Sequence, residues 1–226
     1  MQKIPYASAV GSLMYAQVCT RPDIAFVVGM LGRYLSNPGM DHWKAAKRVM
    51  RYLQRTKDYM LTYRKSDQLE IIGYSDSDFA GCQDSRRSTS GYIFLLAGGA
   101  ISWRSAKQTL VASSTMAAEF VACYEASNHG IWLRNFVTGL RIIGNINVPI
   151  FCDNISAINI AQNPVHHNRT KHIEIRHHFL RDCVSKRKIE ISFVPSQDQL
   201  ADIFTKPLSS ETFSSIRVRL GIMHIE

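Results

Sequence analysis

The chain has 226 residues, of which 46% are hydrophobic and 20% charged, a composition that can bury a core and that excludes a disordered chain. No apolar run approaches the roughly 20 residues needed to cross a bilayer, so we expect neither a membrane span nor a membrane partner. The formal net charge of +9 favours a polyanionic partner.

The cysteines and the N-terminus both indicate an intracellular protein. The first residues lack the basic and then apolar layout of a secretion signal. Five cysteines are scattered without a C-x-x-C pair, so reduced thiols are expected. They are Cys19, Cys82, Cys123, Cys152 and Cys183.

The first third of the chain is predicted to be helical and carries most of the excess positive charge. The first 70 residues contain 11 Lys and Arg against 5 Asp and Glu, which is 6 of the net 9 charges. Helices are expected over Tyr6–Cys19 and near Pro22, with a break at Asn37-Pro38-Gly39. A third helix is expected from an N-cap at Asp41 to Arg55.

The third helix is predicted to have two unlike faces. Apolar residues recur at helical spacing on one face, and five cations line the other. The cations are Lys44, Lys47, Arg48, Arg51 and Arg55. Such a run is typical of a solvated helix face, but with almost no acids between them these side chains are also well placed to bind nucleic-acid phosphates. The pattern leaves both interpretations open.

From residue 69 the pattern changes to short strands and then alternates between helices and strands. The expected strands are Leu69–Ser77, Gly91–Leu96, Ala100–Arg104, one ending at Asp153, and Ile189–Val194. The expected helices are Thr115–Leu140, Asn154–Ala161, Lys171–Lys186, a short one within DQLADIFTK, and one in the tail after Pro207. Consecutive strands favour an antiparallel meander, and strands separated by helices favour parallel pairing. The order predicts an α/β fold with a mixed sheet flanked by helices.

Four acids are expected to converge at one edge of this sheet. They are Asp76 at the end of the first strand, Glu119 early in the long helix, Asp153 at the end of the fourth strand, and Asp202 in the short helix. Taken singly, each has an ordinary explanation as a turn residue, a helix-start charge or a cap. Together they favour a metal site, because clustered carboxylates repel one another unless a cation is bound. Carboxylate ligands favour Mg²⁺ or Mn²⁺, and two such ions can cleave a phosphodiester.

Other polar clusters are weaker candidates. Five histidines suggest zinc, but structural zinc needs two pairs of well-spaced ligands, so we expect them to face phosphates or solvent. They are His166, His167, His172, His177 and His178. The RRSTSG segment that begins at Arg86 is explained equally well by phosphate binding and by turn chemistry. Trp103 and Trp132 are expected in the core.

Long motifs in one order carry a family resemblance. The segments GYSDSDFAG, RRSTSGYIFLLAGGAISWRSAKQ, SSTMAAEFVACYEA, IFCDNISAI, RTKHIEIRHHFLR and QLADIFTKPL resemble the ribonuclease H domain of copia-type LTR retrotransposon Pol polyproteins. The upstream helical segment resembles the part of the same polyprotein between the reverse-transcriptase palm and the ribonuclease H. The resemblance implies a ribonuclease H-like five-stranded mixed sheet with a small N-terminal helical subdomain. It also implies a D-E-D-D site at Asp76, Glu119, Asp153 and Asp202.

The resemblance further implies an endoribonuclease that cleaves the RNA strand of RNA/DNA hybrids with two Mg²⁺ or Mn²⁺ ions. Acid order favours this activity over an integrase, whose glutamate comes last. The expected organisation is a helical connection or thumb segment over 1–66, a ribonuclease H-like domain over 67–207 and a tail helix over 208–226. The expected partners are a hybrid and the polymerase palm, with no small-molecule substrate, in the cytoplasm (a virus-like particle) or the nucleus.

Two departures from the family pattern keep an alternative open. The palm with its Y-x-D-D motif is absent from this chain, so no polymerase activity is expected from it alone. The segment VPSQDQLAD lacks the histidine that many type I relatives place before the last acid. The alternative is a catalytically inactive relic that binds nucleic acid.

Overall fold

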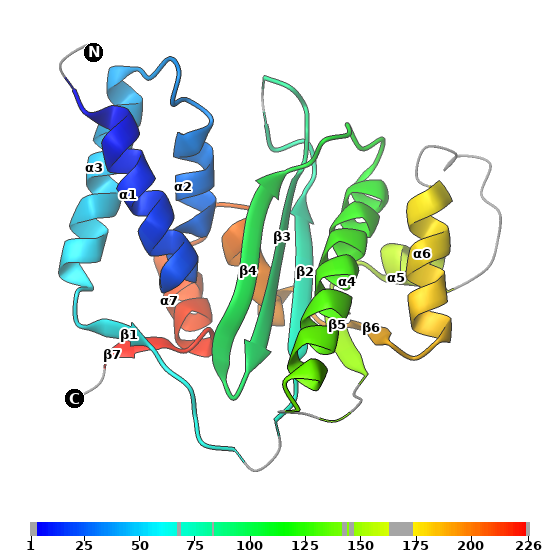
Figure 1. Ribbon diagram of the computed structural model, residues 1–226. Helices are drawn as coiled ribbons and strands as arrows, with labels where there is room; N and C mark the ends of the chain where they lie inside the picture. The colour runs from blue at the N-terminus through cyan, green and yellow to red at the C-terminus, as the bar shows by residue number, and fades with distance from the viewer. Residues whose placement is uncertain are drawn as a thin grey trace.

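The computed structural model describes residues 4–66, 69–82, 84–141, 144, 147–162 and 174–224. Its centre is a five-stranded mixed sheet with the order β4-β3-β2-β5-β6 (Figure 1). The strands are β2 (Ile72–Asp78), β3 (Thr89–Leu96), β4 (Gly99–Lys107), β5 (Val148–Cys152) and β6 (Ile189–Phe193). β2, β3 and β4 pair antiparallel, whereas β5 pairs parallel with both β2 and β6. The predicted mixed sheet is therefore confirmed.

Three helices cover one face of the sheet (Figure 1). They are α4 (Thr115–Gly139), α5 (Ile155–Gln162) and α6 (Glu174–Ser185). The Ser114 side chain caps α4 by accepting a hydrogen bond from the Ala117 amide at 3.2 Å. Fully buried side chains such as Phe94, Ile150 and Leu180 fill the space between the sheet and these helices. Their burial fixes α4, which carries Glu119, against the central strand.

The opposite face is covered by segments from both ends of the chain. The C-terminal segments are the 3₁₀ turns η3 (Ser196–Asp198) and η4 (Leu200–Phe204) and the helix α7 (Ser210–Arg219). η4 and α7 share a buried cluster with α2 (Ala25–Gly32) from the N-terminal third, in which Ile93 and Phe204 are fully buried. The predicted short helix of DQLADIFTK is therefore present, as two turns of 3₁₀ helix.

The N-terminal helices pack around a small core of their own. They are α1 (Tyr6–Cys19), the 3₁₀ turn η1 (Pro22–Ile24), α2 and α3 (Met40–Arg55). The buried side chains of Arg21 and Asp23 form an ion pair at 2.8 Å, and the Tyr52 hydroxyl donates a hydrogen bond to Asp23. The predicted N-cap at Asp41 is wrong. α3 begins one residue earlier, where His42 Nδ1 accepts a hydrogen bond from the Gly39 amide at 2.8 Å.

A second, two-stranded sheet joins the N-terminal third to the tail and was not predicted. β1 (Tyr59–Leu61) pairs antiparallel with β7 (Ile222–His224). Three-residue strands carry too little periodic pattern to be distinguished from loops in the sequence. The segments before residue 66 and after residue 207 therefore contact each other directly, and the three-part division of the chain stays a proposal.

Smaller expectations about burial and strand ends need correction. Trp132 is 57% exposed on α4 instead of lying in the core, and Trp103 is half-buried. β2 continues two residues past Asp76, so that acid lies within the strand and Asp78 ends it. Among the described residues, no helix combines the length and apolarity that a membrane span requires.

Candidate active site

The candidate site surrounds the carboxyl end of β2, where ligand sites of mixed α/β sheets commonly form. Asp76 is 2% exposed and pairs across the sheet with Gly91 of β3. Successive side chains of a strand alternate between its faces, so Asp76 points toward η4 while its neighbour Ser75 points toward α4. Two hydrogen bonds agree with this, since the Thr205 hydroxyl donates to Asp76 Oδ2 and Ser75 Oγ lies 3.3 Å from Cys123 Sγ on α4.

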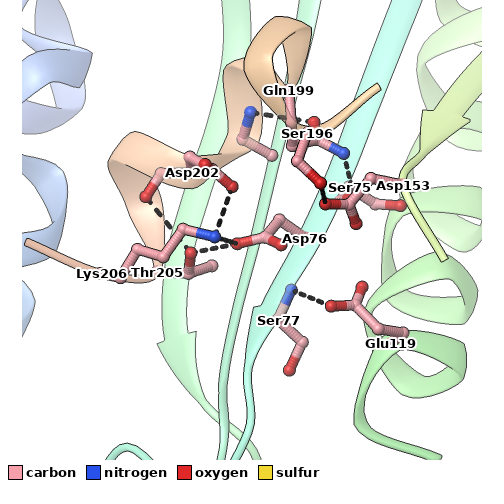
Figure 2. Close-up of polar contacts among 11 residues, drawn as sticks. Ser75, Asp76, Ser77, Glu119, Asp153, Ser196, Gln199, Asp202, Thr205 and Lys206 are labelled. Carbon is pink, nitrogen blue, oxygen red and sulfur yellow. Dashed lines mark hydrogen bonds and ion pairs between the residues drawn. The ribbon is translucent and has the colours of Figure 1, made fainter. Parts of the chain in front are cut away.

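The close approach of η4 to β3 brings Asp202 beside Asp76. A Cβ atom at Gly91 would lie 2.6 Å from Phe204 Cβ and 2.8 Å from Thr205 Cγ2, so only glycine allows this packing. The Lys206 ammonium extends between the two acids, 2.8 Å from Asp202 Oδ1 and 3.9 Å from Asp76 Oδ2 (Figure 2). In this arrangement a cation from the chain itself stabilises two of the four acids.

Glu119 and Asp153 lie on the other side of Asp76 (Figure 2). Glu119 is 4% exposed, and its Oε1 accepts a hydrogen bond from the Ser77 amide at 3.3 Å. Asp153 follows β5, and its Oδ2 accepts a hydrogen bond from Ser196 at 2.7 Å. A ligand atom of Glu119, one of Asp153 and the Cys152 sulfur all lie within 4.8 Å of one another.

The fold thus brings together four carboxylates from β2, α4, the end of β5 and η4. Burial is the main reason that the pKa of Asp76 is raised from 3.8 to about 7. The charge of Lys206 opposes this rise, whereas the charges of Asp202 and Asp153 add to it. Burial, followed by the charge of Asp76 and the Cys152 sulfur, raises the pKa of Glu119 from 4.5 to about 10. Burial also raises the pKa of Asp202. Asp76, Glu119 and Asp202 therefore hold protons more tightly than free carboxylates unless a cation replaces those protons.

The acids in turn affect the pKa of Lys206. Burial lowers the pKa of this lysine, but Asp76, Asp202 and Asp153 outweigh burial, and the pKa is raised above its usual 10.5. Lys206 forms ion pairs with Asp76 and Asp202, whereas Glu119 and Asp153 accept hydrogen bonds from Ser77 and Ser196. Within the described residues, Glu119 Oε2 is buried without a hydrogen-bond partner. A buried oxygen with no partner, next to further acids, fits a divalent cation.

Several supporting residues were not predicted from the sequence. Gln108 is 2% exposed, and its Nε2 lies within hydrogen-bond distance of Ser90 Oγ and the Ala118 carbonyl, which ties the start of α4 to the sheet. Gln199 Nε2 donates to the Ser75 carbonyl at 3.0 Å and anchors η4 over β2. No spacing rule singles out these residues, because each acts across elements that are distant in the sequence.

Cys152 is the other residue that sequence reasoning missed at this site. It was interpreted only as one of the scattered thiols, although it directly precedes Asp153. Alternation along β5 directs Cys152 into the core under α4, and its sulfur lies beside the acids. The hydrogen-bonding contact with Cys123, burial and the charge of Asp153 raise the pKa of the Cys152 thiol. A sulfur therefore lies beside the carboxylates that the sequence suggested as candidate ligands.

The five cations of α3 all lie on its exposed side, away from the buried Ala46 and Val49. Lys44 pairs with Asp41 at 3.0 Å, and Lys47 lies 5.8 Å from the centre of the Trp43 ring. The cations Arg48, Arg51 and Arg55 are likewise exposed. The helix α3 lies apart from β2 in the fold (Figure 1).

The described residues include only some of the histidines that the sequence singled out, but the whole of the RRSTSG segment. Of the five histidines, His166, His167 and His172 and the side chain of His177 lie outside the described residues. His178 Nδ1 lies 2.8 Å from Arg181 on α6. In the RRSTSG segment, Ser88 Oγ accepts a hydrogen bond from the Ala80 amide at 3.1 Å, which agrees with a turn-stabilising role.

Comparison with known proteins identifies the relatives of this chain, although no family model matches it. The retrovirus-related Pol polyprotein from transposon TNT 1-94 of Nicotiana tabacum is 43% identical over 222 residues, which make up 98% of the chain. The chain belongs to the retrovirus-related Pol polyproteins of transposons. The family resemblance expected from the motifs is confirmed, and the chain spans 17% of the length of that Pol polyprotein.

Two further similarities extend the comparison of this Pol segment. Secreted RxLR effector protein 161 of Plasmopara viticola is 50% identical over 133 residues, which are 59% of the chain and 94% of that protein. The solved structure of LC11-RNase H1, isolated from compost, is 17% identical, covers 65% of the chain and 96% of its own length, and gives a TM-score of 0.46. The expected α/β fold with a five-stranded mixed sheet flanked by helices is confirmed by the strand order described above.

Proposed function

We propose that this Pol segment is a ribonuclease H that cleaves the RNA strand of RNA/DNA hybrids during reverse transcription of a retrotransposon. The observation that carries the proposal is the convergence of Asp76, Glu119, Asp153 and Asp202, where one buried oxygen of Glu119 has no hydrogen-bond partner among the described residues. Membership of the Pol family supports the choice of substrate, because hybrids arise when RNA is copied into DNA.

We propose that the four acids hold two Mg²⁺ or Mn²⁺ ions. Ions held there would supply Lewis acidity for hydrolysis of a phosphodiester, as in other two-metal hydrolyses. The chain contributes the positions of the ligands. Ser77 and Ser196 orient Glu119 and Asp153 through the hydrogen bonds at 3.3 and 2.7 Å, and Thr205 orients Asp76.

Lys206 has a definite role in this proposal. Its ammonium partly compensates the charges of Asp76 and Asp202 before ions bind. The lysine therefore favours the ionised form of both acids and aligns them in a buried position, where bare carboxylates would repel each other.

We propose that the cations of α3 bind the phosphate backbone of the hybrid outside the catalytic centre. They are Lys44, Lys47, Arg48, Arg51 and Arg55, and their exposure on one side of one helix supports this role. We further propose that residues 1–66 form a connection-like segment that contacts the polymerase palm of the parent polyprotein. Residues 67–207 would be the nuclease and 208–226 its tail, acting inside the cell in a virus-like particle or the nucleus.

A second candidate function is nucleic-acid binding without catalysis. The position of Lys206 favours it, because an ion pair at 2.8 Å with Asp202 occupies a carboxylate that a metal ion would need. In such a relic the basic face of α3 would be retained while the acids would no longer bind ions.

One experiment separates the two functions. An RNA/DNA hybrid labelled on the RNA strand is incubated with the chain with and without Mg²⁺, beside Asp153→Asn, which keeps the size of the side chain and an acceptor for Ser196. Cleavage that requires Mg²⁺ and is lost in Asp153→Asn, leaving 5′-phosphate and 3′-hydroxyl ends, supports the nuclease. Binding of the hybrid without cleavage by either protein supports the relic.

A further inference from the structure

A buried thiol lies beside two of the acids at the candidate site. Cys152 is 0% exposed, and its sulfur lies within 4.8 Å of ligand oxygens of both Glu119 and Asp153. Magnesium has little affinity for sulfur, whereas Zn²⁺ and Cd²⁺ bind thiolates strongly. The site thus offers a ligand that the proposed magnesium chemistry does not use.

The structure assigns Glu119, Cys152 and Asp153 as a three-ligand site for a sulfur-binding divalent cation such as Zn²⁺ or Cd²⁺. A second observation points to the same place, since Glu119 Oε2 is buried in a 4% exposed side chain without a partner among the described residues. Two oxygens and one sulfur suit a tetrahedral ion that keeps one position open.

The geometry requires little movement to close around an ion. Atoms that bind tetrahedral zinc at about 2.0–2.3 Å lie roughly 3.3–3.7 Å apart, so a set within 4.8 Å needs to contract by about 1 Å. Cys152 is held at the end of β5, and its sulfur accepts a hydrogen bond from the Asn154 amide at 3.4 Å. Binding breaks the S–H bond of Cys152 and forms a sulfur–metal bond, and the proton passes to solvent.

The consequence for activity rests on the proposed function. Glu119 and Asp153 are two of the four acids proposed to hold Mg²⁺, so a sulfur-bound ion would remove them from magnesium. We therefore expect Zn²⁺ to inhibit hybrid cleavage when Mg²⁺ is in large excess, and a chelator that prefers Zn²⁺ to restore it.

Cadmium binding tests the site without any measurement of cleavage. The full chain carries Cys19→Ser and Cys82→Ser, which remove the two thiols that are not buried. Cd²⁺ is then added, and the ultraviolet charge-transfer band from sulfur to cadmium is recorded. We expect one equivalent to produce the band, Cys152→Ser to abolish it, and added Mg²⁺ to shift the titration to higher Cd²⁺ concentration.

Two variants keep the test decisive even if Cys152→Ser folds poorly. Glu119→Gln keeps the thiol and removes one carboxylate, and we expect it to weaken cadmium binding at least tenfold. Cys183→Ser removes a buried thiol on α6 and should leave the band unchanged. A band that survives in Cys152→Ser, or an unaltered titration in Glu119→Gln, would overturn the assignment. Because the band does not require cleavage, a chain that binds Cd²⁺ in this way but never cuts a hybrid would refute the nuclease alone.

Discussion

The acids at the end of β2 and the cations of α3 are two charged regions of this molecule that differ in origin and in exposure to solvent. The acids come from four distant segments, and three of them are less than 10% exposed. The cations come from one helix and are all exposed. Buried like charges interact strongly and shift one another's pKa, whereas exposed charges are screened by water and salt. The buried acids therefore repel one another until a bound cation compensates their charge. The exposed cations only attract phosphates from solution.

Neutralising Asp76 should produce the largest effect and should separate activity from stability. We expect Asp76→Asn to reduce Mg²⁺-dependent hybrid cleavage by at least about a hundredfold, because the ligand between the other acids is lost. The same change should raise the melting temperature of the metal-free protein at neutral pH. A melting temperature that falls together with activity would show that Asp76 is a structural partner of Lys206 and not a strained ligand.

The pH dependence of stability follows from the raised pKa of Asp76. The unfolded chain releases this proton near pH 3.8, and the folded chain retains it until about pH 7. Between these values the unfolded state binds fewer protons than the folded state, so folding loses stability as pH rises. We expect the melting temperature of the metal-free protein to fall over this window, and the fall to be smaller in Asp76→Asn.

Gly91→Ala should disturb the acids through packing alone. A Cβ atom here would lie 2.6 Å from Phe204 Cβ, so η4 must move away from β3, at a cost of about 1–3 kcal/mol. Asp202 and Lys206 would move with it, and cleavage should fall more than hybrid binding. Gly11→Ala is the matched control, since nothing lies within 4 Å of a Cβ atom there. Equal activity in the two variants would contradict the role of η4.

Removing exposed cations should have a smaller effect of a different kind. We expect Lys47→Gln with Arg51→Gln to weaken hybrid binding, because two phosphate contacts are lost. The log–log salt slope should fall by about 1.8, at roughly 0.9 per contact. Arg64→Gln with Lys65→Gln removes two exposed charges from the loop after β1 and serves as the charge-matched control. An equal loss in both pairs would show that net charge, not the face of α3, binds the hybrid.

Lys206→Met should change cleavage least, because it should lower stability while it raises Mg²⁺ affinity. The metal-free protein should lose stability, because Asp202 loses its ion pair at 2.8 Å. Magnesium affinity should rise severalfold, because a competing cation is removed. The measurements are thermal melting and a Mg²⁺ titration, with Lys206→Arg as the variant that keeps the charge. Lower Mg²⁺ affinity in Lys206→Met would show that the lysine assists ion binding instead of competing with it.

The same contrast explains what could be predicted from the sequence. The basic face of α3 follows from helical spacing alone, and the sheet follows from the order of strand and helix patterns. The acids could be selected because three of them lie next to strand ends or early in helices and because the motifs resemble one family. Lys206, Gln199 and Cys152 could not be assigned roles, because their partners are fixed by tertiary packing between η4, β2 and α4. The β1–β7 pair was missed for the same reason, since it joins residues more than 150 positions apart in the sequence.

Calorimetric titration of Mg²⁺ into the metal-free chain, at a pH between the Asp76 value of about 7 and the Glu119 value of about 10, tests the central claim most directly. We predict two bound ions and a release of protons, seen as a binding enthalpy that changes with the ionisation enthalpy of the buffer. Both should be lost or reduced in Glu119→Gln. Absence of binding, or binding without proton release that is identical in Glu119→Gln, would contradict the claim that the four acids form a metal site.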